Sequence, residues 1–80
     1  MELSKAAQIY YDLCFDVNGK SLCIQPYFNS KVDKQRYGYC FTEKVLDELL
    51  KTGRIKCTYR SKKYVNICGT NENGEIEFWL

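Results

Sequence analysis

The chain has 80 residues, of which 45% are hydrophobic and 28% charged, a composition that supports one folded domain and excludes a second domain or a disordered chain. The net charge of +2 is too small to indicate nucleic-acid binding by itself. No apolar run approaches the ~20 residues of a membrane helix, and the N-terminus lacks the apolar stretch of a signal peptide. We therefore expect a single soluble domain over residues 1–80, in the cytoplasm and without a membrane partner.

The first predicted element is a β-hairpin centred on Asn18-Gly19. Apolar residues alternate with polar ones on both sides of this step, which is typical of strands. The alternating apolar residues are Ile9, Tyr11, Leu13, Phe15, Val17, Leu22, Ile24, Pro26 and Phe28. Asn-Gly favours a two-residue type I′ turn, which pairs Phe15 with Leu22 on one apolar face.

An alternative for the same segment is a helix over residues 4–17. Ser4 is a suitable N-cap. Apolar residues also lie near helical spacing, at Ala6, Ile9, Leu13 and Val17. The hairpin is favoured because a single register aligns the apolar residues on both sides of the turn.

The middle of the chain contains one predicted loop and one predicted helix. Residues 29–40 are polar and show no periodicity, so a long mobile loop is expected there. Thr42 is a suitable N-cap for a helix that Gly53 terminates. The apolar stripe of this helix consists of Val45, Leu46, Leu49 and Leu50. It is the only helix that the favoured interpretation contains.

Alternation returns after this helix in three short runs, which predicts three further strands. The first connection places Cys57 opposite Val65. Asn73-Gly74 repeats the hairpin signal and places Ile67 opposite Leu80. The predicted class is therefore α+β, with the order ββαβββ and one helix packed on one face of an antiparallel sheet.

Five cysteines and no histidine limit the available chemistry. An odd number of cysteines without an export signal predicts reduced thiols, although the hairpin register would bring Cys14 and Cys23 close enough to be bridged. The cysteines are too widely spaced for the C-x-x-C pairs of zinc sites, and no Ser-His or Cys-His pair is possible. We therefore expect no catalytic residue, no metal, no cofactor and no enzyme activity.

The basic hairpin 54–64 is a candidate nucleic-acid-binding site. Five cations and no acid lie between Arg54 and Lys63. Tyrosines lie among them, in the run Tyr59, Arg60, Lys62, Lys63 and Tyr64. In such a mixture the cations neutralise phosphates and the rings stack on bases.

Protein binding is a second interpretation, because seven tyrosines and one tryptophan exceed what so small a core can bury. Tyrosine and tryptophan are favoured at interface hot spots, and the acids near the C-terminus add a second charged surface. The candidate binding residues are Tyr10, Tyr27, Lys34, Arg36, Tyr37, Tyr39, Tyr59, Arg60, Lys62, Lys63, Tyr64, Glu75, Glu77 and Trp79. The alternative is that the tyrosines only rim the core.

In its small size, its lack of catalytic motifs, its composition rich in Lys, Asn and Tyr, and its uneven charge, the whole chain resembles the small anti-defence proteins of phages and mobile elements, including anti-CRISPR proteins. The resemblance implies a non-enzymatic inhibitor, a monomer or homodimer in the host cytoplasm. Its partner would be a host protein or a protein–nucleic-acid complex. A nucleic-acid-binding module that uses hairpin 54–64 and a homo-oligomeric structural protein are the alternatives.

Overall fold

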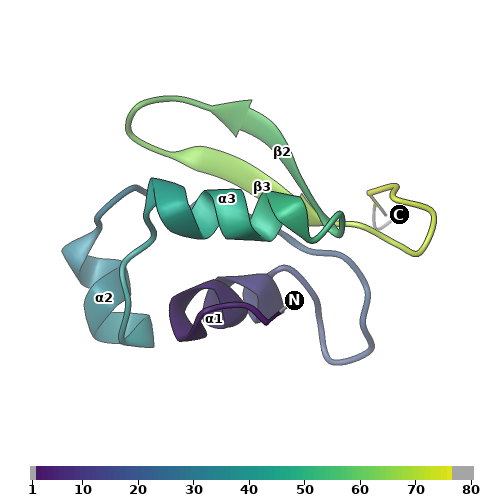
Figure 1. The fold of residues 1–80 in the computed structure, drawn as a ribbon, viewed down its shortest axis with the longest axis horizontal. Coiled ribbons are helices and arrows are strands. Elements are labelled where there is room, and N and C mark those ends of the chain that lie inside the picture. The colour runs from purple at the N-terminus through teal and green to yellow at the C-terminus, as the bar shows by residue number, and fades with distance from the viewer. Residues whose placement is uncertain (1, 77–80) are drawn as a thin grey trace.

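The computed structural model describes residues 2–76 and contains three helices and three strands in that range (Figure 1). In chain order they are α1 (Lys5–Leu13), β1 (Cys23–Ile24), α2 (Lys31–Tyr37), α3 (Glu43–Lys51), β2 (Ile55–Arg60) and β3 (Val65–Gly69). The mixed α+β class is confirmed. The predicted order ββαβββ with a single helix differs from this arrangement, because α1 replaces the first predicted strand and α2 lies in the predicted loop.

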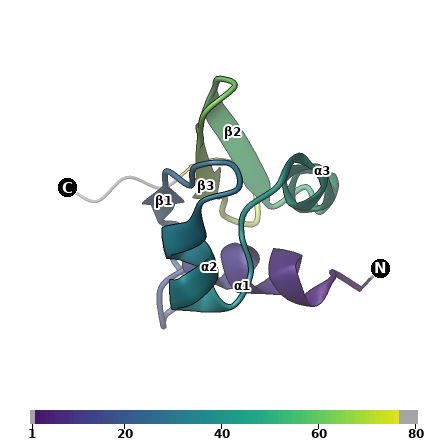
Figure 2. The same ribbon diagram turned by 90° about the vertical axis from the view of Figure 1, so that its left-hand side faces the viewer.

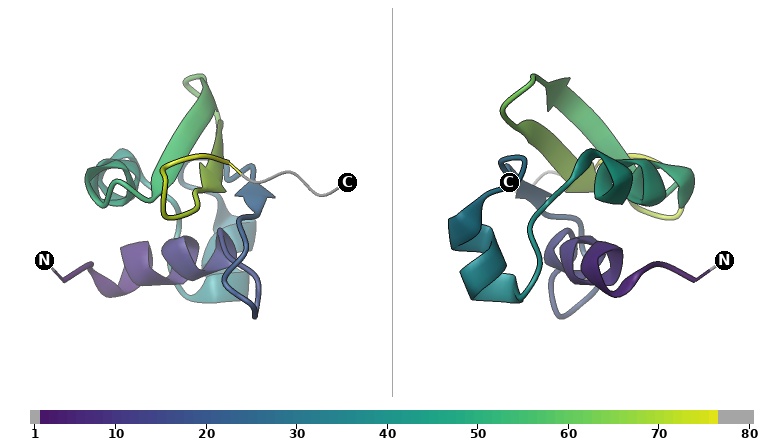
Figure 3. Two further views of the ribbon diagram at one scale, coloured as in Figure 1. Left: turned by 90° about the vertical axis from the view of Figure 1, so that its right-hand side faces the viewer. Right: turned by 60° about the vertical axis from the view of Figure 1, so that its left-hand side comes forward.

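The strands form an antiparallel sheet in the order β1-β3-β2, so that β3 is central. α3 lies along one side of the β2–β3 hairpin, and α1 and α2 lie at the base of the sheet (Figure 2). The turn of the hairpin projects away from α1 and α2 (Figure 3). Within residues 2–76, no helix covers the side of the hairpin opposite α3.

α1 lies where the first strand was predicted. The prediction of an N-terminal hairpin is therefore wrong, and the alternative prediction of a helix in this segment is correct in the type of element. Ser4 is the N-cap, and its hydroxyl accepts a hydrogen bond from the Ala7 N–H at 3.2 Å. The buried stripe consists of Ala7, Tyr10 and Cys14, at helical spacing. Val17 was expected on the apolar face of the element in both interpretations, but its side chain is 100% exposed. Packing of the Ala7–Tyr10–Cys14 stripe decides the segment in favour of a helix.

Asn18-Gly19 forms a turn, but with a three-residue loop instead of a two-residue one. The Gly19 N–H donates to the Asp16 carbonyl at 2.9 Å, and the Asp16 N–H donates to the Lys20 carbonyl at 2.9 Å. The Asp16 carboxylate accepts from the N–H groups of Asn18 and Lys20 at 2.8 and 2.9 Å. Gly19 has a φ of 79°, the left-handed conformation that closes such a loop.

This loop changes the register of its flanks. Phe15 bridges Ser21 and not Leu22. Side chains alternate between the two faces of a strand. A register shift of one residue therefore pairs each residue of one flank with a residue that was predicted on the opposite face of the other flank. The predicted juxtaposition of Cys14 and Cys23 is therefore absent.

The second Asn-Gly step repeats this geometry with Asn71 in the place of Asp16. The Asn71 side-chain oxygen accepts from the N–H groups of Asn73 and Glu75 at 2.9 and 3.0 Å, and the Gly74 N–H donates to the Asn71 carbonyl at 3.0 Å. A tight turn is therefore present where one was predicted. The strand expected after it, which includes Leu80, extends beyond the described residues.

The β2–β3 hairpin is present, but its register differs from the prediction by two residues. Cys57 pairs with Ile67 and not with Val65, and a β-bulge interrupts the ladder between Cys57 and Tyr59. On its other side Ile67 pairs with Ile24 of β1. A shift of two residues preserves the face on which each side chain lies, so the predicted inward positions of this hairpin remain inward.

α3 confirms the predicted helix. Thr42 is its N-cap, with its hydroxyl accepting from the Val45 N–H at 3.2 Å. The predicted stripe faces the core, where Val45, Leu46 and Leu49 are buried and Leu50 is partly buried.

α2 occupies the segment that was predicted as a loop. Ser30 caps it by accepting from the Asp33 N–H at 3.2 Å, and Gly38, with a φ of 87°, ends it. α2 has no buried residue, which explains why no hydrophobic periodicity indicated it.

The core lies between α1, α3 and the sheet. Its buried members are Ala7, Tyr10, Cys14, Phe41, Val45, Leu46, Leu49, Ile55, Val65 and Ile67. Gly69 of β3 passes so close to the end of α1 that a Cβ there would meet the Cys14 carbonyl oxygen and the Phe15 ring. This close approach requires glycine for steric reasons and brings the sheet against the helix.

Candidate binding surface

Three tyrosines meet at the sheet. Tyr27, which follows β1, bridges Tyr64, which precedes β3, and their ring centroids lie 5.0 Å apart with an interplanar angle of 33°. Tyr59, near the end of β2, contacts Tyr64 with a centroid distance of 5.3 Å and an angle of 32°. Tyr27 and Tyr59 are 52% and 51% exposed. We call these three residues the tyrosine cluster.

Strand alternation places the cluster on the open face of the sheet. Val65 and Ile67 point into the core and are fully buried, so Tyr64 and Asn66 point to the opposite face. The Asn66 side-chain amide donates to the Thr58 hydroxyl at 2.6 Å. This bond fixes the bulged part of β2 that carries the third ring.

Ser61 holds the turn of the hairpin. Its hydroxyl accepts from the N–H groups of Lys63 and Tyr64 at 3.2 and 3.1 Å. The Ser61 N–H donates to the Tyr64 carbonyl at 2.9 Å. The backbone on which Tyr64 is mounted is therefore fixed before any partner is bound.

The same hairpin carries exposed cations, which are Lys56, Arg60, Lys62 and Lys63. Arg60 forms an ion pair with Glu43 of α3 at 3.8 Å. Because both side chains are largely exposed, the pair contributes little to the stability of the fold. The hairpin therefore combines aromatic rings with an excess of positive charge.

The phenol pKa of Tyr64 is raised above 10.0, first by the electrostatic influence of Tyr59 and then by burial and by Tyr27. A hydrogen bond with the Tyr59 side chain also contributes to the raised pKa. The Tyr64 phenol is therefore held in its neutral form within the cluster.

Tyr10, predicted at a binding surface, lies in the interior, where it contacts Tyr37 and Phe41, whereas Tyr37 is only partly buried. Tyr10 is 1% exposed, its ring packs edge-to-face against Tyr37 at 5.8 Å and Phe41 at 5.0 Å, and its hydroxyl donates to the Tyr39 carbonyl at 2.7 Å. Burial raises the pKa of Tyr10 to about 12. The predicted exposure of Tyr10 is wrong because the hairpin face on which it depended does not form.

The remaining candidates lie away from the β2–β3 hairpin. Lys34 is exposed on α2, and Tyr39 is 40% exposed just after that helix. Glu75 is exposed in the turn that follows β3. Glu77 and Trp79 lie outside the described residues, so the predicted acidic, aromatic surface is represented only by Glu75.

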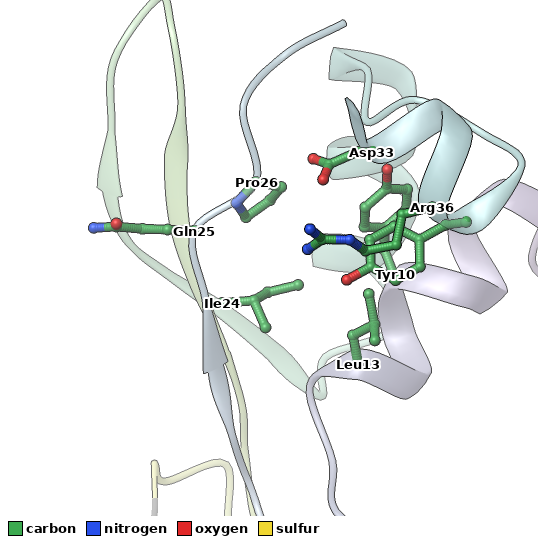
Figure 4. A pocket seen from close by; sticks show the side chains of 8 residues that line it. Tyr10, Leu13, Ile24, Gln25, Pro26, Asp33 and Arg36 are labelled. Carbon is green, nitrogen blue, oxygen red and sulfur yellow. The ribbon is translucent and has the colours of Figure 1, made fainter. Parts of the chain in front are cut away.

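A cavity of about 250 Å³ lies between α1, α2 and the β1 segment (Figure 4). It is lined by Tyr10, Leu13, Ile24, Gln25, Pro26, Asp33, Arg36 and Tyr37. The Arg36 and Asp33 side chains extend toward its opening, whereas Gln25 points away from it (Figure 4). The cavity offers both polar and apolar wall surface with one cation and one anion, and it is smaller than typical pockets for drug-sized ligands.

Cys23 of β1 and Cys68 of β3 form a disulfide bond and lie directly opposite each other in the ladder. The predicted reduced state is therefore wrong for this pair, and the partner of Cys23 is not Cys14. No sequence signal identified the pair, because the β1–β3 pairing was not predicted. Cys14, Cys40 and Cys57 are free thiols.

Cys14 is the most buried of the three free thiols in residues 2–76. Burial raises the pKa of the Cys14 thiol to about 12, which suppresses the nucleophilic thiolate. Between residues 2 and 76, no three or more of the metal-ligating His, Cys, Asp and Glu side chains come together.

No protein-family model, curated protein or solved structure matches the chain. Among the helices of residues 2–76, none has the length and apolar character needed to cross a membrane.

Proposed function

We propose that this chain is a small, non-enzymatic inhibitor that binds a host protein through the tyrosine cluster and the cations of the β2–β3 hairpin. The proposal places it with the anti-defence proteins of phages and mobile elements that its composition resembles, acting in the host cytoplasm. Inhibition would follow from covering a functional surface of the partner. The cluster is the observation on which the proposal depends.

The mutual packing of the three rings favours protein recognition. Each ring contacts another ring, with centroids 5.0 and 5.3 Å apart, while Tyr27 and Tyr59 remain half exposed. Rings that are fixed before binding lose little conformational entropy on association. Such a preorganised aromatic patch has the character of an interface hot spot.

The charge of the hairpin indicates the chemistry of the partner surface. Lys56, Lys62 and Lys63 are exposed on the hairpin that carries Tyr59 and Tyr64, and the ion pair between Arg60 and Glu43 is exposed and weak. A complementary partner surface would therefore be acidic, with apolar or aromatic residues opposite the cluster.

Direct binding of single-stranded nucleic acid is the second candidate, favoured by the cations that share the hairpin with Tyr59 and Tyr64. We rank it second because the three rings contact one another through their faces and edges. Base stacking requires a free ring face, and Tyr64, between its two neighbours, has little of its ring available.

Two assays on the same protein separate the candidates. The tagged chain is incubated with lysate of a bacterial host, and it is separately titrated with a fluorescent 20-nucleotide oligothymidine at two salt concentrations. The proposed function predicts capture of one protein in stoichiometric amount at 300 mM salt and weak oligonucleotide binding. Tight oligonucleotide binding that weakens steeply with salt, without protein capture, would establish the second candidate instead.

A matched pair of charge variants controls for net charge. Lys62→Glu with Lys63→Glu changes the hairpin, and Lys31→Glu with Lys34→Glu makes the same change in charge on α2. Capture should be lost in the first double variant and retained in the second. The unmodified chain could instead elute by itself as a discrete oligomer whose tyrosines are shielded from solvent. That result would favour the homo-oligomeric structural protein.

A further inference from the structure

The disulfide and the tyrosine cluster lie on the same face of the same pair of strands. Cys23 is opposite Cys68, and four residues further along each strand Tyr27 is opposite Tyr64. An even number of residues preserves the face in a β-ladder, and four residues span about 13 Å. The bond therefore lies one short strand length from the ring contact, in register with it.

The backbone attachment between these two points is short. β1 has two residues, and Pro26, which lies between the disulfide and Tyr27, has no N–H to donate to β3. The segment is held there by the Val65 N–H, which donates to the Pro26 carbonyl at 3.2 Å, and by the Phe28 N–H, which donates to the Lys63 carbonyl at 2.9 Å. Ile24 and Phe28 also pack against the core, and the Gly69 N–H donates to the Leu22 carbonyl at 3.1 Å. The disulfide is thus the covalent part of an otherwise noncovalent attachment.

We propose that the Cys23–Cys68 bond is a thiol–disulfide exchange site through which a dithiol reductant controls the tyrosine cluster. The effect on partner binding rests on the proposed function, whereas the structural effect on the β1 segment does not. The oxidised form holds Tyr27 against Tyr64, and the reduced form releases it.

Accessibility decides where exchange begins. Cys23 is exposed, whereas Cys68 is 1% exposed. A thiolate of the dithiol attacks the Cys23 sulfur, the Cys23–Cys68 bond breaks, and Cys68 leaves as a thiolate that takes up a proton. The second thiol of the reductant then attacks its own mixed disulfide and releases Cys23. In total the protein gains two electrons and two protons, and the dithiol becomes a disulfide.

Release of the β1 segment should lower affinity by lowering the population of the assembled cluster. If the assembled form falls to about one tenth of the reduced protein, the apparent affinity falls about tenfold. Tyr59 and Tyr64 remain on their own hairpin, so binding is weakened and not abolished. A reducing cytoplasm would then hold the protein in its weaker-binding form, and oxidation would strengthen binding.

Hydrogen exchange tests the structural part without a partner. Peptide mapping by mass spectrometry first establishes whether Cys23 and Cys68 are joined in air-oxidised protein. Amide exchange is then compared before and after reduction with dithiothreitol. We expect at least tenfold faster exchange at Phe28, Val65 and Gly69, and no change at Leu46 in α3.

Variants connect the structural effect to binding. Cys23→Ser should show the fast exchange and weak capture of the reduced form with or without dithiothreitol, and Cys40→Ser should respond to dithiothreitol like the unmodified chain. Absence of the Cys23–Cys68 link in oxidised protein, or unchanged exchange after its reduction, would overturn the proposal. If exchange responds but oxidised protein captures no partner, the redox-sensitive attachment stands and the proposed function fails.

Discussion

Ser4 and Glu48 join the start of α1 to α3 by two hydrogen bonds. The Ser4 N–H donates to one Glu48 carboxylate oxygen at 3.0 Å, and the Ser4 hydroxyl donates to the other at 2.8 Å. The same hydroxyl oxygen accepts from the Ala7 N–H and caps α1. One side chain therefore both begins a helix and fixes its position against a neighbouring helix.

Removing this hydroxyl should destabilise the whole domain. We expect Ser4→Ala to lower the free energy of unfolding by about 1–2 kcal/mol, because the cap of α1 and a bond to α3 are lost together. Urea denaturation followed by circular dichroism measures the change. Ser30→Ala removes the corresponding cap of α2, which has no buried residue, and should have a smaller effect on global stability. Equal losses in the two variants would contradict this role for Ser4.

The same contact predicts a pH dependence. Hydrogen bonds from the Ser4 N–H and hydroxyl lower the pKa of Glu48 below 4.5, with smaller contributions from Lys44 and Lys51. The carboxylate therefore stabilises the fold fully above pH 4.5, and this contribution is lost as the pH falls through the lowered pKa. Glu48→Gln should be less stable than the unmodified chain at pH 7, with the difference shrinking toward pH 3. A difference that stayed constant across this range would rule out the carboxylate as its source.

Gly69 offers a steric test of the contact between sheet and helix. A Cβ at this position meets the Cys14 carbonyl oxygen and lies 2.7 Å from the Phe15 ring. Because a backbone atom cannot move aside easily, Gly69→Ala should cost about 2–3 kcal/mol or more. Gly53→Ala, where nothing lies within 4 Å but φ is 75°, should cost only about 1 kcal/mol of backbone strain. Thermal unfolding of both variants provides the comparison. A small loss of stability in Gly69→Ala would show that β3 is packed more loosely against α1.

Local signals explain what could be predicted from the sequence. α3 was predicted because its cap at Thr42, its apolar stripe and its terminator at Gly53 are all encoded within one segment. Tyr59 and Tyr64 were placed together on the basic hairpin for the same reason, since a short connection joins their strands.

Long-range packing explains what could not be predicted. The α1 segment has apolar residues at both strand and helix spacing, and only the burial of Ala7, Tyr10 and Cys14 against distant residues decides between them. The turn at Asn18-Gly19 was assigned the wrong length because the Asp16 side chain, outside the Asn-Gly pair, selects it. Pairing of β1 with β3 joins segments far apart in the chain. It completes the tyrosine cluster with Tyr27 and forms the disulfide, so neither had a local signal.

Cys14 should be inert in the folded protein. Its side chain is fully buried and its pKa is raised to about 12, so the reactive thiolate is scarce at pH 8. We expect iodoacetamide to modify Cys14 at least about a hundredfold more slowly than Cys40, which is partly exposed. Peptide mass spectrometry at successive times gives both rates. Comparable rates under conditions in which the domain stays folded would contradict the burial of the α1 stripe.

The tyrosine cluster gives the most direct test of the proposed function. Tyr59→Ala removes a half-exposed ring from the cluster, and Tyr39→Ala removes a ring of 40% exposure outside it. Tyr39 contributes its backbone carbonyl to Tyr10, which the alanine variant retains. The two variants therefore differ mainly in whether the cluster is altered.

The deciding measurement is the dissociation constant of the captured protein for the unmodified chain and for these two variants, determined by calorimetry on oxidised protein. We predict that Tyr59→Ala weakens binding about thirtyfold, the roughly 2 kcal/mol typical of a hot spot, while Tyr39→Ala changes it less than about twofold. Equal dissociation constants for the unmodified chain and folded Tyr59→Ala would contradict a binding role for the cluster.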